Sequence, residues 1–139
     1  MSIFVSPRFL SRVMAVDAVS CLATGGLQLA LAGPMAALTG LPADLLVASG
    51  AFLVVYAALA GWIARREQPP RILIGLIALG NLGWGIGCIG LMAAGPWPLG
   101  GWGMAWLAAQ AITVLVLAEL QWTGLRRTRR TSGAVPARS

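Results

Sequence analysis

The sequence predicts an all-α fold: an integral membrane bundle of four transmembrane helices with both termini in the cytoplasm. The chain is 58% hydrophobic and only 10% charged, and its apolar residues gather in four long stretches. Each stretch has about the 20 residues that a helix needs to cross the hydrocarbon core of a bilayer. We therefore expect spans at about 9–32, 42–64, 71–94 and 101–124, which form one transmembrane domain over residues 1–125.

The positions of the cations orient these spans. All ten are Arg, and they lie before or at the start of the first span, between the second and third spans, and after the fourth. The connections 33–41 and 95–102 contain no cation. Because cytoplasmic loops are enriched in Lys and Arg, this one-sided distribution predicts that both ends of the chain are cytoplasmic.

Proline and glycine mark the ends of the predicted helices. Pro7 suits the first position of the first helix, and the pair Gly33-Pro34 is expected to end it. Further breaks are expected at 68–70 and 95–98, where prolines precede the third and fourth spans. Tryptophans near both ends of the spans, Trp106 among them, fit the aromatic belts of membrane proteins.

Two segments lie outside the predicted spans. Residues 35–41 are expected to form at most a short interfacial turn. The tail 126–139 is polar and basic, which predicts a disordered cytoplasmic segment. Its cations are expected to bind anionic lipid headgroups, each worth about 1 kcal/mol near a membrane surface. These headgroup-binding residues are Arg126, Arg127, Arg129 and Arg130.

A cleaved signal peptide is the alternative interpretation of the first span. Two Arg residues precede it, and the Ala-Leu-Ala sequence at 30–32 resembles a cleavage site. However, the apolar run is longer than a usual signal sequence and contains Asp17. We expect the span to be retained, and the alternative stays open.

Apart from Asp44 in the first turn of the second span, two acidic residues lie inside the predicted spans. Asp17 and Glu119 approach the cytoplasmic face at similar depth, and charged groups in a span are candidates for function. They could meet and share a proton. Alternatively, each pairs with a nearby cation, Arg12 or Arg126, whose long side chain reaches the membrane surface. The second interpretation is favoured.

Uncharged polar residues complete a candidate intramembrane polar site. Asp17, Cys21, Thr24 and Gln28 recur at steps of four, three and four, so they form one stripe along the first helix. Such a stripe is expected to face the bundle or a subunit contact, most simply for interhelical hydrogen bonding. The other candidates lie in the second, third and fourth spans: Tyr56, Asn81, Gln110, Thr113 and Glu119.

Small residues in the third span predict close helix packing. Gly80, Gly83, Gly87 and Gly90 share one face, and Gly83 and Gly87 form a GxxxG motif. Glycines let two helix backbones approach closely in a membrane. This face is therefore expected to pack within the bundle or in a dimer.

The residue inventory argues against catalysis. The chain has no His, and its two cysteines, Cys21 and Cys88, stand in separate spans. Nothing signals a metal site, a disulfide or a cofactor, and no nucleotide-binding or hydrolase motif is present. The basic tail suits lipid better than nucleic acid, so no nucleic-acid partner is expected.

The opening residues 6–10 before Asp17, and residues 118–121 before the Arg cluster, resemble those of small four-span bacterial membrane proteins of the DoxX type and of similar uncharacterised proteins. This resemblance implies an inner-membrane component, sometimes an accessory to oxidoreductases. Arg without Lys, with abundant Ala, Gly and Trp, also suggests a bacterial chain. We expect a non-enzymatic accessory or scaffold subunit that packs with itself or a partner. The alternative is a small proton-coupled transporter that uses Asp17 and Glu119.

Overall fold

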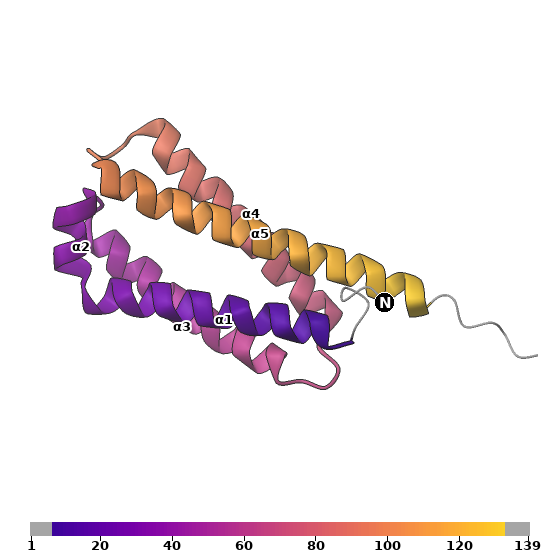
Figure 1. Cartoon of the computed structure of the whole chain (residues 1–139). Coiled ribbons are helices and arrows are strands. Elements are labelled where there is room, and N and C mark those ends of the chain that lie inside the picture. Colours follow the sequence, from indigo (N-terminus) through magenta and orange to yellow (C-terminus); the bar gives the residue numbers. More distant parts are fainter. Residues whose placement is uncertain (1–6, 133–139) are drawn as a thin grey trace, which may run out of the picture.

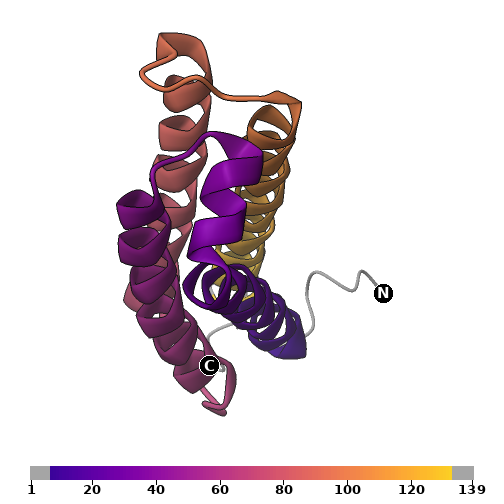
Figure 2. The same ribbon diagram turned by 90° about the vertical axis from the view of Figure 1, so that its left-hand side faces the viewer.

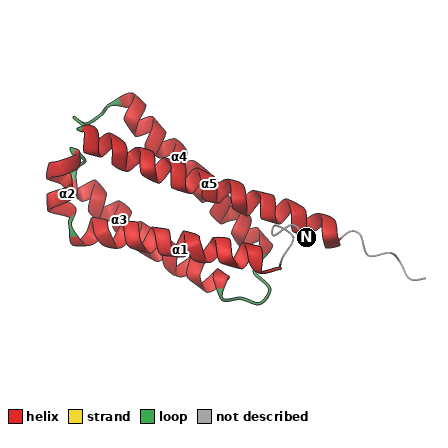
Figure 3. Ribbon diagram, in the orientation of Figure 1, coloured by secondary structure: helices red, strands yellow, loops and turns green. Residues whose placement is uncertain are grey.

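The computed structural model describes residues 7–132, which form five helices and no strand (Figures 1 and 3). Four of these helices are long and apolar enough to cross a membrane, which confirms the predicted all-helical fold with four such helices. The helices are α1 (Pro7–Ala30), α2 (Ala32–Thr39), α3 (Ala43–Ala64), α4 (Arg71–Ala94) and α5 (Gly101–Ser132).

The first predicted break differs in its position. The chain turns at Leu31, where α1 ends and α2 begins, and Pro34 lies inside the first turn of α2. Proline is tolerated there because the first N–H groups of a helix have no acceptor within it. α2 ends at Thr39 and is capped by Gly40, whose backbone is left-handed (φ 79°) and whose N–H bonds to the carbonyl of Ala36.

The start of the predicted disordered tail is wrong, because α5 continues to Ser132. The guanidinium of Arg71, at the start of α4, explains the extension. It donates to Oγ1 of Thr128 at 2.6 Å and to the carbonyl of Leu125, which ties the last turns of α5 to α4. Arg126 lies over the Trp122 ring at 5.3 Å, and residues 133–139 lie outside the described part of the chain.

The long helices form two hairpins. α1 packs on α3 as the first hairpin, and α4 packs on α5 as the second hairpin (Figure 2). The hairpins meet through α1 and α5, and α2 adds contacts to both α3 and α5. α3 and α4, in contrast, have little close backbone contact. This unequal packing leaves space between the hairpins.

Close contacts between helices occur at glycines, and the predicted stripe takes part only through Gly80, which lies against Tyr56. A Cβ added to Gly85 of α4 would lie 2.8 Å from the Leu115 side chain of α5, so this glycine allows α4 and α5 to pack closely. A Cβ on Gly83, Gly87 or Gly90 would meet nothing within 4 Å, and all three glycines are exposed. The predicted stripe therefore contributes little to packing within the chain.

The two ends of the bundle have different character. The start of α1, the α3–α4 connection and the end of α5 lie at one end (Figure 1), where the described Arg residues gather. α2 covers the other end, where Met35 and Leu41 pack with Leu46 of α3 and Leu107 of α5. Which side of a membrane either end faces stays a prediction.

Candidate functional site

A buried polar cluster joins three helices at the level of Asp17. The Asp17 side chain is 0% exposed, and its Oδ2 accepts hydrogen bonds from Asn81 Nδ2 of α4 at 2.8 Å and from Gln121 Nε2 of α5 at 2.7 Å. Asn81 Nδ2 also donates to Gln121 Oε1 at 3.2 Å. The Cys21 thiol, one turn later on α1, donates to Asp17 Oδ1 at 3.4 Å. The cluster therefore satisfies a buried carboxyl with uncharged donors alone.

The structure does not bring Asp17 and Glu119 together. Glu119 is exposed on α5, two residues before Gln121, which is about 200° around the helix. Within residues 7–132, neither acid has an ion-pair partner, so the predicted pairing with Arg12 or Arg126 is not seen either. Their positions along the spans predict a similar depth for both acids, but helix rotation separates them.

The polar stripe of α1 faces into the bundle, as one of the two predicted orientations requires. Asp17, Cys21 and Gln28 are buried, and Thr24 is partly buried. Gln28 Oε1 accepts a hydrogen bond from Ser49 Oγ of α3 at 2.9 Å. The stripe thus makes interhelical hydrogen bonds at two levels, to the second hairpin at Asp17 and to α3 at Gln28.

Aromatic side chains bridge the gap between α3 and α4. Phe52 of α3 stacks on Trp84 of α4, with ring centroids 5.8 Å apart. The Tyr56 hydroxyl donates to the carbonyl of Ile77 at 2.8 Å, one turn before Asn81 on α4. A Cβ on Gly80 would lie 3.3 Å from the same hydroxyl, so Gly80 makes room for Tyr56. These side chains, rather than backbone contact, connect the two helices.

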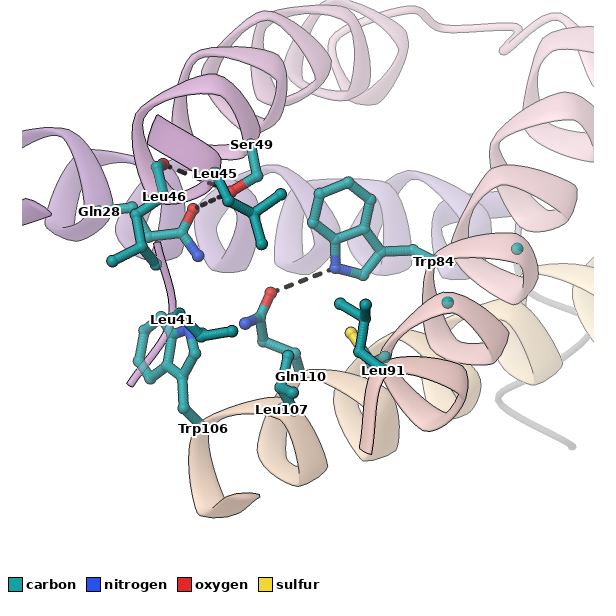
Figure 4. A pocket seen from close by; sticks show the side chains of 13 residues that line it. Gln28, Leu41, Leu45, Leu46, Ser49, Trp84, Leu91, Trp106, Leu107 and Gln110 are labelled. Atoms are coloured by element: carbon teal, nitrogen blue, oxygen red, sulfur yellow. Dashed lines mark hydrogen bonds between the residues drawn. The ribbon is translucent and has the colours of Figure 1, made fainter. Parts of the chain in front are cut away.

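A cavity of about 450 Å³ lies between the hairpins, in the half of the bundle near α2 (Figure 4). All four long helices contribute to its wall. Gly83 and Gly87 on its rim are exposed, so the cavity reaches the surface of the bundle beside α4. The residues that line it are Gln28, Leu41, Leu45, Leu46, Ser49, Gly83, Trp84, Gly87, Cys88, Leu91, Trp106, Leu107 and Gln110.

Sequence reasoning missed three residues of these sites. Gln121 was not a candidate, although it follows Gln110 by eleven residues and so lies only about 20° away from it around the helix. Ser49 gave no periodic signal. Trp106 was expected in an aromatic belt, but it lines the cavity.

Thr113 takes no part in either site's hydrogen bonding. Its hydroxyl donates to the carbonyl of Ala109 in its own helix, and the residue is exposed. Both cysteines are buried and unpaired with each other. No group of three or more His, Cys, Asp or Glu side chains in residues 7–132 is placed to hold a metal ion.

Comparisons with known proteins add no assignment. No protein-family model, curated protein or solved structure matches the chain. The resemblance to DoxX-type proteins therefore stays a prediction.

Proposed function

We propose that this chain is a non-enzymatic membrane protein that binds a small lipophilic molecule between its two hairpins. The cavity of about 450 Å³ carries this proposal. Protein interiors pack densely, with few voids larger than a water molecule, whereas ligand pockets range from about 300 to 1,000 Å³. A space of this size is thus typical of a binding site rather than of a packing defect.

The lining of the cavity supports a lipophilic occupant. Five leucines line the wall, and none of the lining residues carries a formal charge. The exposed rim at Gly87 would face lipid chains in a bilayer. A molecule dissolved in the membrane would therefore reach the cavity from the side.

Quenching of tryptophan fluorescence by a brominated alkane tests this proposal. The protein would keep Trp84 and Trp106, which line the cavity, and its other tryptophans would be replaced by Phe. Undecyl bromide added to detergent micelles should quench this fluorescence along a saturable curve, because bromine quenches on contact.

Two glycines offer a matched pair of variants. Gly87 and Gly90 share the exposed face of α4, and a Cβ on either would meet nothing within 4 Å, but only Gly87 lines the cavity. Gly87→Phe should abolish the saturable quenching, and Gly90→Phe should preserve it. Equal quenching in both variants, or no saturation in the parent, would overturn the proposal.

An accessory or scaffold subunit, the function expected from the sequence, is the second proposal. The exposed glycines Gly83, Gly87 and Gly90 support it, because they would let a second helix approach α4 closely. Purification of the tagged native protein in mild detergent, with mass and partner identification, tests this role. A stoichiometric partner supports it, and a lone monomer argues against it.

A proton-coupled transporter is the third proposal, with its residues revised. Asp17 remains a candidate because its buried carboxyl has only uncharged partners. A smaller cavity of about 220 Å³, lined by Asn81 and Trp84 among others, lies beside this cluster. The exposed Glu119 loses its role. Asp17→Asn should abolish proton-dependent uptake in vesicles while the helical fold survives, and unchanged uptake would exclude this coupling.

A further inference from the structure

The orientation of one amide shows which hydrogen-bonding group faces the cavity. Trp84 Nε1 donates to Gln110 Oε1 at 3.2 Å (Figure 4). Because an indole nitrogen can only donate, the amide must present its oxygen to Trp84. The amide nitrogen of Gln110 consequently points the other way, toward the cavity, and has no hydrogen-bond partner among the described residues.

A second donor on the same wall also lacks a partner. Trp106 lies one turn before Gln110 on α5, and its Nε1 is buried with no hydrogen-bond partner in the described chain. A buried N–H without an acceptor is unfavourable, and native structures rarely leave one unexplained. An acceptor atom within hydrogen-bonding distance of both nitrogens would satisfy both.

A second amide at the cavity follows the same pattern as Gln110. Gln28 Oε1 accepts from Ser49 Oγ at 2.9 Å, so its nitrogen is the group left over (Figure 4). The amide oxygens of Gln28 and Gln110 thus each accept a hydrogen bond within the protein, and both amide nitrogens are left as donors.

These observations specify the ligand more closely, and the inference rests on the proposed function. We propose that the cavity binds a neutral lipophilic carbonyl compound, such as a ketone or ester. Its carbonyl oxygen accepts from Gln110 Nε2 and Trp106 Nε1, and its hydrocarbon chain lies against the leucines. A carboxylate or phosphate fits poorly, because an anion buried without a cation is strongly disfavoured and the wall offers none.

A matched ligand series tests this assignment. Methyl nonyl ketone, methyl nonyl carbinol and undecane have the same carbon chain and differ at one carbon. Each would compete with undecyl bromide for the protein that keeps Trp84 and Trp106, at equal mole fractions in the micelle. The ketone should displace the bromide at about tenfold lower mole fraction than undecane.

Variants then assign the donors. Gln110→Met keeps the shape of the side chain and removes its donor, and Trp106→Phe removes the other. Each should bring the ketone close to the value for undecane measured in the same variant, with undecyl bromide as the shared competitor. Thr113→Val, at an exposed position on the same helix that does not line this cavity, should leave the preference for the ketone intact.

The outcomes separate the two proposals. Equal displacement by ketone and undecane, or a preference for the carbinol over the ketone, overturns the carbonyl assignment and leaves the binding site in place. A preference for the ketone that survives both donor variants also overturns it. Absence of saturable quenching by undecyl bromide overturns both proposals.

Discussion

Gly25 of α1 and Gly50 of α3 meet backbone to backbone. A Cβ added to Gly25 would lie 2.7 Å from the carbonyl oxygen of Gly50, and one added to Gly50 would lie 3.0 Å from that of Gly25. Helices in a membrane gain no hydrophobic free energy from touching each other, so dispersion contacts at such close approaches stabilise their association. This contact holds the first hairpin together.

The pair Gly25 and Gly26 gives the first prediction. Gly25→Ala should destabilise the bundle by about 1–3 kcal/mol, because α1 must move away from α3. Gly26→Ala, where a Cβ would meet nothing within 4 Å, should be neutral or stabilising by up to about 1 kcal/mol. Unfolding in mixed micelles with rising denaturing detergent, followed by circular dichroism, measures both. Equal stability of the two variants would contradict the close contact.

The polar cluster gives the second prediction. Asp17→Ala should lower the free energy of unfolding by at least about 1–3 kcal/mol, because the amides of Asn81 and Gln121 lose their buried acceptor. Glu119→Ala, at an exposed position, should change it by less than about 0.5 kcal/mol. The same unfolding titration compares them. A larger effect at Glu119 than at Asp17 would show that the two roles are reversed.

The bridge between α3 and α4 gives the third prediction. Tyr56→Phe removes the hydrogen bond to the Ile77 carbonyl and keeps the ring, so it should cost about 0.6–2 kcal/mol. Thr113→Val removes a hydroxyl that bonds within its own exposed turn and should cost less. Amide hydrogen exchange of α3 and α4 should accelerate in the first variant alone. Unchanged exchange there would mean that the bridge adds little.

Membrane orientation gives the fourth prediction. If both ends are cytoplasmic, a fluorescent protein fused after the last residue should fold and fluoresce, and alkaline phosphatase inserted in the connection 95–100 should be active. The physical reason is the retention of Arg-rich segments on the cytoplasmic side. The inverse pattern of activities would reverse the predicted orientation.

The apolar stretches predicted the helices because length and hydropathy are local properties of a chain. The inward direction of Asp17, Cys21 and Gln28 was also predictable, because polar groups that recur on one helix face avoid lipid. The spacing of Gln121 from Gln110 carries the same signal, because eleven residues bring the two side chains to nearly the same face of the helix.

The partners of each helix could not be predicted from the sequence. Gly25 and Gly83 are equally small, and the sequence does not distinguish them. Gly25 is a contact because Gly50 of α3 lies against it, whereas a Cβ on Gly83 would meet nothing within 4 Å. The cavity was likewise invisible, because it depends on the separation of α3 from α4 and on the rotation of Trp106 toward the interior.

The cap that α2 places over one end of the bundle affects how a ligand would be supplied. Since Met35 and Leu41 close that end, a bilayer rather than the aqueous phase would be the reservoir from which the cavity fills. Each additional CH₂ in a ligand favours the bilayer by about 0.8 kcal/mol, roughly a fourfold rise in its local concentration. Apparent affinity measured in aqueous units would then climb with chain length even if every contact inside the protein stayed the same.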